Sequence, residues 1–219
     1  MVDIFDEIEE ELRAEKAQQL LKRYAGLILA LAILIIAVAG AWQGWRWYTA
    51  RQDMRAATEY IATISALDAA GPNAAGRQAT LPGFEHVATE SPEGYRTLAR
   101  LHAAALKADA GDIPGAAALW DQVAGDSAAD PLLRDLASLM WASHQIDQGD
   151  PARVAARLKP LAEPGNAWRP MAREQLALLD LRQGHTEEAR TALRKLSQDV
   201  TAPAGVRGRS AALLARLSG

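Results

Sequence analysis

The chain has 219 residues, with 27 acidic and 24 basic side chains and a formal net charge of −3 at pH 7. Residues 49–219 carry 20 Asp or Glu and 19 Lys or Arg, which argues against nucleic acid as a partner, because the phosphate backbone calls for a basic face. No cysteine is present, so the sequence excludes a disulfide framework, a thiolate nucleophile and a cysteine-based zinc site. Alanine is abundant and aromatic residues are few, a composition that favours an all-α fold.

A long apolar stretch near the N-terminus predicts a transmembrane helix. Residues 24–45 contain no formal charge over 22 positions, and at about 1.5 Å per residue they span roughly 33 Å, enough to cross a hydrocarbon core of about 30 Å. Basic residues precede this stretch and aromatic residues crowd its far end, as expected for side chains in the headgroup zone. This membrane-interface belt comprises Lys22, Arg23, Trp42, Trp45, Trp47 and Tyr48.

The orientation follows from what flanks the segment. A short region, residues 1–23, precedes it and a long domain follows it, which favours a signal-anchor with a cytoplasmic N-terminus and an exported C-terminal domain. An alternative is cleavage at Ala37-Val38-Ala39, which has the small-x-small form of a signal-peptidase site. We favour an uncleaved anchor, because the leading region is acidic and the apolar run exceeds the usual length of about 7–15 residues.

Residues 1–23 form an acidic head with an apolar stripe. Ile4, Ile8 and Leu12 recur at a spacing of four residues, which predicts one apolar helical face. Two interpretations stay open: a docking helix for a cytoplasmic partner, or a solvated helix that continues into the membrane segment. Binding flat on an anionic leaflet is disfavoured by the acidic faces.

Residues 46–92 are predicted to form a long helix and a short helix that lead into the rest of the domain. The long helix continues outward from the membrane segment without Pro or Gly until Gly71-Pro72-Asn73, which breaks it. Residues 70–80 are small and polar and indicate a loop. The short helix begins near Pro82 and carries Phe84 and Val87 until Ser91-Pro92.

Residues 93–199 contain three similar units that are aligned on the turn glycines Gly111, Gly149 and Gly184. Seven residues before each glycine the chain has alanine, five residues after it a small apolar residue, and nine residues after it a large one. These positions are Ala104, Ala142 and Ala177, then Ala116, Val154 and Ala189, then Trp120, Leu158 and Leu193. The pattern predicts helical hairpins whose small residues allow close approach and whose apolar faces are buried by stacking.

Turn and cap residues support these hairpins. Each glycine is predicted to adopt the left-handed conformation that ends a helix. Asp112 and Asp150 follow as N-cap candidates and Pro151 suits a first helical position. Pro160 is expected to end the second helix of the middle unit early.

The units resemble the tetratricopeptide repeat (TPR), whose period is about 34 residues with small residues around a turn glycine. The resemblance implies an all-α solenoid. In the chain this solenoid follows the predicted transmembrane helix. Residues 200–219 are expected to form a C-terminal helix that caps the exposed end of the solenoid. If the TPR register holds, the first helices present a concave groove for a peptide or partner helix, or the groove is filled by the long helix or the cap. The candidate groove residues are Leu98, Leu101, Leu136, Leu139, Ile146, Met171, Leu178 and Leu181.

No catalytic, cofactor or metal site is predicted. The four histidines (His86, His102, His144 and His185) lack paired metal spacing, and no G-x-S-x-G, P-loop or H-E-x-x-H motif occurs. His102 and His144 occupy first helices of successive units and are interpreted as ordinary surface or half-buried residues rather than as a facing pair. Trp120, Trp141 and Trp168 are interpreted as core or interface residues.

The arrangement as a whole resembles the ancillary subunit family of the bacterial SecYEG translocon. The resemblance rests on the single anchor followed by Gly44-Trp45-Arg46-Trp47-Tyr48, the Tyr95–Ala105 stretch, the turn at Gly111-Asp112-Ile113 and Val200-Thr201 with Pro203 before the last helix. It implies a non-enzymatic inner-membrane protein with a periplasmic domain, which contacts translocon subunits, periplasmic chaperones or exported chains, and lipid through residues 24–45. No cofactor and no small-molecule substrate is expected. The alternative is a periplasmic scaffold for envelope or cell-division machinery.

Overall fold

The computed structural model describes the backbone of residues 4–218 and the side chains of residues 23–27 and 29–217. Every helix or strand assigned within residues 4–218 is an α-helix, which confirms the predicted all-α fold. The chain divides into two compact units, Met1–Gln52 and Asp53–Gly219, and each is described by itself.

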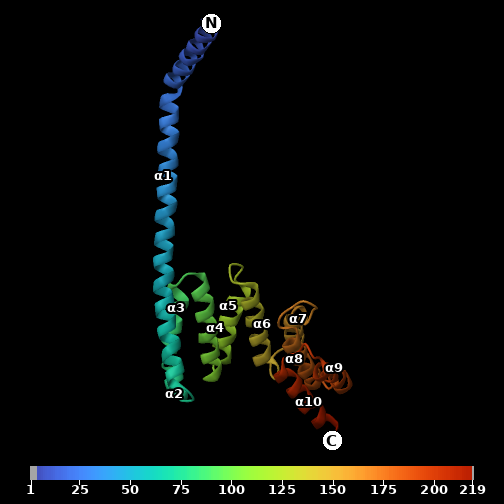
Figure 1. The fold of residues 1–219 in the computed structure, drawn as a ribbon. Coiled ribbons are helices and arrows are strands. Elements are labelled where there is room, and N and C mark those ends of the chain that lie inside the picture. The colour runs from blue at the N-terminus through green and yellow to red at the C-terminus, as the bar shows by residue number, and fades with distance from the viewer. Residues whose placement is uncertain (1–3, 219) are drawn as a thin grey trace. The chain divides into compact units, whose positions relative to one another are not determined.

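The first helix, α1, runs over 67 residues from Ile4 to Ala70 and therefore contributes to both units (Figure 1). It ends where Gly71 adopts a φ of 52°, a left-handed conformation that glycine adopts without a Cβ penalty. The backbone of the acidic head is helical from Ile4. The side chains of its apolar stripe lie outside the described residues, so the stripe stays a prediction.

A short helix occupies the segment for which a loop was predicted. Helix α2, Ala74–Gln78, interrupts residues 70–80 because the Asn73 side chain caps it, accepting a hydrogen bond from Gly76 N at 3.2 Å. Helix α3, Leu81–Glu90, follows with Pro82 in its first turn, as predicted, and it buries Phe84 and Val87.

Three helical hairpins and a final helix follow. The hairpins pair α4 (Glu93–Asp109) with α5 (Ile113–Gly125), α6 (Pro131–Gln145) with α7 (Pro151–Leu161), and α8 (Arg169–Arg182) with α9 (Thr186–Gln198). Helix α10 extends from Ala204 to Ser218. The nine residues that align around the turn glycines are all buried, with exposed fractions of 0–1%. This confirms the predicted hairpin register.

The predicted caps hold as well. Asp112 Oδ1 accepts a hydrogen bond from Gly115 N at 2.9 Å, and Asp150 Oδ1 accepts one from Ala152 N at 3.0 Å. Pro151 begins α7, and Pro160 lies in its last turn. Because proline cannot continue the hydrogen-bond ladder, α7 has 11 residues, whereas α5 and α9 have 13 each.

Two clusters of buried side chains hold the domain together. One joins α4 to α8 through Trp120, Trp141 and Leu158. The other joins α3 to α4 around Phe84, and side chains of the α1 segment within the second unit, among them Tyr60, pack against it. The first cluster contains residues of all three hairpins. The hairpins thus bury their apolar faces against one another, as expected for a solenoid.

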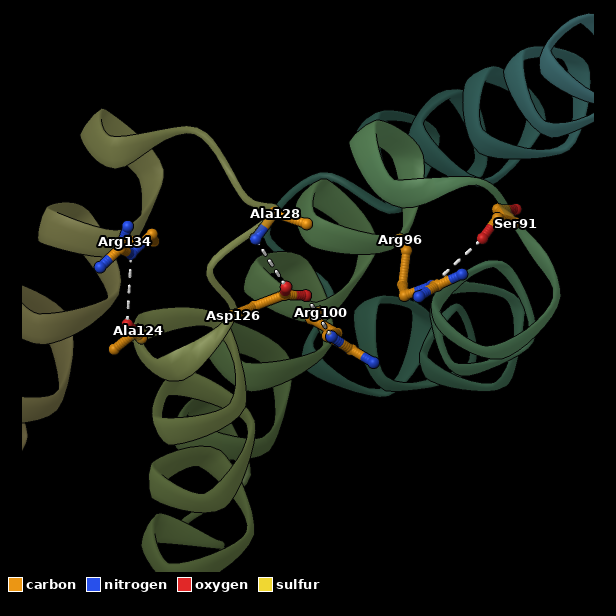
Figure 2. Close-up of polar contacts among 7 residues, drawn as sticks. All are labelled: Ser91, Arg96, Arg100, Ala124, Asp126, Ala128 and Arg134. Atoms are coloured by element: carbon orange, nitrogen blue, oxygen red, sulfur yellow. Dashed lines mark hydrogen bonds and ion pairs between the residues drawn. The ribbon is translucent and has the colours of Figure 1, made fainter. Parts of the chain in front are cut away.

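Arginine side chains reinforce the junctions between successive helices. In the first turn of α4, Arg96 Nε donates to Ser91 O at 3.2 Å, and in α6 Arg134 Nε donates to Ala124 O at 3.4 Å (Figure 2). Both arginines stand 15 residues before their turn glycine. Each thereby donates to a carbonyl at the end of the preceding helix, where the backbone ladder leaves acceptors without partners.

A second arginine joins the two helices of the first hairpin. Arg100 Nη1 lies 3.4 Å from Asp126 Oδ2, and the Asp126 carboxylate also accepts a hydrogen bond from Ala128 N at 3.1 Å (Figure 2). Arg173 occupies the same register in α8, and its Nε donates to Ala162 O at 3.3 Å. These positions correspond to the early Trp of the TPR consensus, so polar contacts replace an aromatic one here.

Candidate functional site

A groove of about 270 Å³ lies between α4 and α6, with α5 at its base. We call it the α4–α6 groove. Leu98 and Leu101 project from α4, and Leu133, Leu136 and Met140 from α6. Positions three or four residues apart share a face of a helix, so each helix contributes one apolar stripe. The floor is the Trp120 ring, which is 1% exposed.

The predicted groove residues are therefore brought together only in part. Leu98, Leu101 and Leu136 line the α4–α6 groove and are half-buried. Leu139 does not, because it is turned into the core and is only 3% exposed; its assignment to the groove is wrong. Ile146 and Met171 pack against the same core.

The predicted groove does not continue openly to the third hairpin. Leu178 lines a separate cavity, of about 430 Å³, between α8 and α10, to which α10 contributes Arg209, Leu213 and Arg216. Leu181 is half-buried. Helix α10 thus lies beside this end of the predicted groove and leaves a cavity there.

Two histidines contact aromatic rings near the α4–α6 groove and do not pair with each other. The His102 ring stacks on Phe84 with centroids 4.9 Å apart, and the His144 ring lies 4.7 Å from Trp120. Burial lowers the pKa of His102 below 6.5, against the opposing effect of Asp68. His102 therefore contributes a neutral ring to the groove near pH 7, beside the leucine side chains that line it.

The turn glycines differ in what constrains them. Gly111 and Gly184 have φ values of 83° and 82°, the left-handed conformation that was predicted. Gly149 lies in the turn between α6 and α7, but it is not among the glycines with positive φ. Its constraint is steric instead, because a Cβ there would lie 2.7 Å from Gln145 O.

The aromatic part of the predicted belt is exposed. Trp42, Trp45, Trp47 and Tyr48 have exposed fractions of 57–69%. The Arg51 guanidinium lies 4.1 Å from the centre of the Trp47 ring, within cation–π range. Arg23 is exposed, whereas the side chain of Lys22 lies outside the described residues.

The helix that carries these residues is the one helix in the described part of the chain that is long and apolar enough to cross a membrane. Its most apolar 18-residue window has a mean hydropathy of 2.6 and is 0% buried. Among the described side chains, no group of three His, Asp or Glu residues is arranged to hold a metal ion.

One structural pair escaped the sequence analysis. Glu174 of α8 is 3% exposed, and both of its carboxylate oxygens accept hydrogen bonds from Arg209 of α10, at 2.7 and 2.6 Å. This contact raises the pKa of Arg209 above its usual value. Neither Glu174 nor Arg209 is among the aligned positions of the repeat, and 35 residues separate them, so the sequence did not predict this pair.

A family model described as the tetratricopeptide repeat-like domain matches residues 18–202. No curated protein and no solved structure matches the chain.

Proposed function

Because the chain belongs to the tetratricopeptide repeat-like domain family, we propose that it is a non-enzymatic protein that binds partner proteins through the α4–α6 groove. The observation that carries the proposal is the groove itself, where Leu98, Leu101 and Leu136 surround a space of about 270 Å³ above the Trp120 ring. Full burial of a partner's Leu or Phe side chain contributes about 1.5–3 kcal/mol. A few such side chains give a specific contact.

We further propose that α1 anchors the protein in the bacterial inner membrane, with the N-terminus in the cytoplasm and the helical domain in the periplasm. Support comes from the uncharged stretch of residues 24–45 and from the exposed aromatic belt beyond it. The partners in this proposal are subunits of the protein-export translocon, periplasmic chaperones and newly exported chains. This finer assignment rests on the resemblance to the ancillary translocon subunits.

Charge substitutions in the groove test the binding function. Leu101→Asp together with Leu136→Asp places two carboxylates in an apolar site, so recovery of translocon subunits with the full chain from solubilised membranes should fall about tenfold or more. The matched control is Ala118→Asp, at an exposed position of α5, which should leave recovery unchanged. Thermal unfolding of each variant separates lost binding from lost folding.

Leu139→Asp gives a further comparison. Leu139 is part of the buried core, so this variant should unfold, whereas the groove variants should keep the melting temperature of the unchanged protein within a few degrees. Undiminished recovery of translocon subunits with the folded groove variant would contradict the proposal.

A further inference from the structure

A larger groove lies between the two helices of the third hairpin, and we call it the α8–α9 groove. Its volume is about 650 Å³. Leu176 and Ala177 of α8 and Ala192 and Leu196 of α9 form an apolar floor, of which Ala177 and Leu196 are buried. Its lining along α9 extends from Glu187 to Asp199, about 18 Å at a helical rise of about 1.5 Å per residue.

The same face is filled in the second hairpin. The positions eight residues before and after the turn glycine hold Trp141 and Arg157 there. Trp141 is buried, and Arg157 lies 4.2 Å from the centre of its ring and forms an ion pair with Asp121 of α5. The corresponding positions in the third hairpin hold Leu176 and Ala192. The smaller side chains leave this face hollow.

Charged groups surround the apolar floor unequally. The rim carries four carboxylates, Asp180, Glu187, Glu188 and Asp199, against the basic groups of Arg173 and Lys195. Glu187 is also paired with Arg190, at 2.5 Å. Burial raises the pKa of Asp180 and the charge of Glu188 adds to this effect, while His185 at 4.0 Å opposes it. A cation placed beside Asp180 and Glu188 would therefore be favoured by both carboxylates.

We propose that the α8–α9 groove is a second protein-binding site, which takes a short helical segment with apolar side chains on one face and Lys or Arg beside them. The apolar face packs on Leu176, Ala192 and Leu196, and the basic side chains meet Asp180 and Glu188. The length of the groove suits about three helical turns. The acidic residues 1–15 of the chain have the opposite charge pattern, which points to a basic segment of another protein.

A labelled synthetic helix tests this site directly. The probe is a three-turn peptide with Leu and Ala on one face and Lys on the other, and its binding to the full chain in zwitterionic lipid nanodiscs is measured by fluorescence anisotropy. Empty nanodiscs give the background. We expect saturable binding that weakens as salt rises, and at least about tenfold weaker binding of the same peptide with Glu in place of Lys.

Two variants and a matched control locate the binding. Glu188→Lys reverses a rim charge, and Thr191→Trp fills the groove from an exposed position. Each variant should therefore bind the Lys peptide at least about tenfold more weakly than the unchanged protein does. Asp147→Lys makes the same change of charge at an exposed position outside the groove. This control should weaken binding of the Lys peptide by less than about twofold.

Three results would overturn the proposal. The first is equal binding of the Lys and Glu peptides, and the second is Lys-peptide binding that neither groove variant changes. The third is no peptide binding together with a dimeric mass that Thr191→Trp converts to a monomer, because a second copy would then occupy the groove. Circular dichroism checks that each variant keeps its helices. If one groove variant misfolds, the other alone is compared with Asp147→Lys.

Discussion

At position 149 the backbone of the preceding helix occupies the space where a side chain would begin. An ideal Cβ on Gly149 would lie 2.7 Å from Gln145 O and 2.8 Å from Gln145 Cβ, closer than van der Waals contact allows. Gly149 N also donates to the same carbonyl oxygen at 2.8 Å. Relief of the crowding would have to break that hydrogen bond or shift the end of α6.

We therefore expect Gly149→Ala to lower the free energy of unfolding by about 1–3 kcal/mol, the usual cost of forcing atoms into a packed site. Gly94→Ala is the matched control, because Gly94 lies in α4 and a Cβ there would meet nothing within 4 Å. That change should stabilise the protein by about 0.4–1 kcal/mol through the unfolded state. Urea unfolding followed by circular dichroism measures both, and equal effects would contradict the steric account.

His102 links the stability of the α1–α3–α4 contact to pH. Its ring lies 4.9 Å from Phe84 and 5.9 Å from Tyr60, and burial lowers its pKa below 6.5 while Asp68 opposes the shift. The unfolded chain therefore binds more protons than the folded chain between the two pKa values. This contribution to stability is complete above about pH 6.5 and is lost as pH falls toward the folded pKa.

The expected result is a decline in the free energy of unfolding below about pH 6.5 that is reduced in His102→Phe, which keeps an aromatic ring but cannot titrate. His86→Gln serves as the control, since the His86 side chain is 61% exposed. Urea unfolding at a series of pH values measures the slope. A slope in His102→Phe that equals that of the unchanged protein would exclude His102 as its source.

At the scale of elements, α10 covers the end of the solenoid through one charged contact as well as through packing. The Arg209 guanidinium meets both oxygens of the buried Glu174 carboxylate, and Val206 and Ser210 of α10 are 2% and 0% exposed. Removal of the guanidinium would leave a carboxylate without its cation in a buried site, which is costly. We therefore expect the contact to help hold α10 against α8.

Arg209→Ala should destabilise the protein by about 2 kcal/mol, less than the roughly 3–5 kcal/mol for a fully buried pair, because the Arg209 side chain is 61% exposed. Arg216→Ala, on the same exposed side of α10, should cost less than about 0.5 kcal/mol. Hydrogen exchange of the α10 amides, with the unfolding free energy, measures both effects. Unchanged exchange in Arg209→Ala would show that packing alone holds the helix.

The hairpin register could be predicted from the sequence because its signals are local. Ala104, Ala142 and Ala177 recur at one distance from a glycine, and small residues at a helix crossing are among the clearest periodic marks in a chain. The same register contained the arginine contacts at Arg96 and Arg134. They were not predicted, because the acceptors are backbone carbonyls, which carry no sequence signal.

The course of the groove could not be predicted in full. Leu136 and Leu139 stand three residues apart on α6, yet one lines the groove and the other is buried. The groove-facing side and the core-facing side of a helix are adjacent, and leucine is common on both. Only the packing of α7 and α8 decides which of the two leucines is buried. Likewise, the cavity at Leu178 depends on the position of α10, which meets α8 across 35 residues of sequence through Arg209 and Glu174.

At the scale of the whole molecule, a helix long and apolar enough to cross a membrane precedes a domain of the tetratricopeptide repeat-like family in the chain. If that helix anchors the protein as proposed, the domain stays close to the bilayer, which raises its effective concentration for partners in the same membrane. An apolar groove in such a domain favours segments of partner proteins over free solutes. The proposed function is thus partner binding at the membrane.

Site-specific photo-crosslinking in cells tests that claim most directly. A photoreactive residue at Leu101 or Leu136 lies in the α4–α6 groove, while the same residue at Ala118 lies on an exposed face of α5. The account predicts adducts from Leu101 and Leu136, identified by mass spectrometry as translocon subunits, chaperones or exported chains, and few from Ala118. Adducts with division or cell-wall proteins would contradict the export role in favour of a scaffold, and groove positions that give no more adducts than Ala118 would contradict the use of this groove.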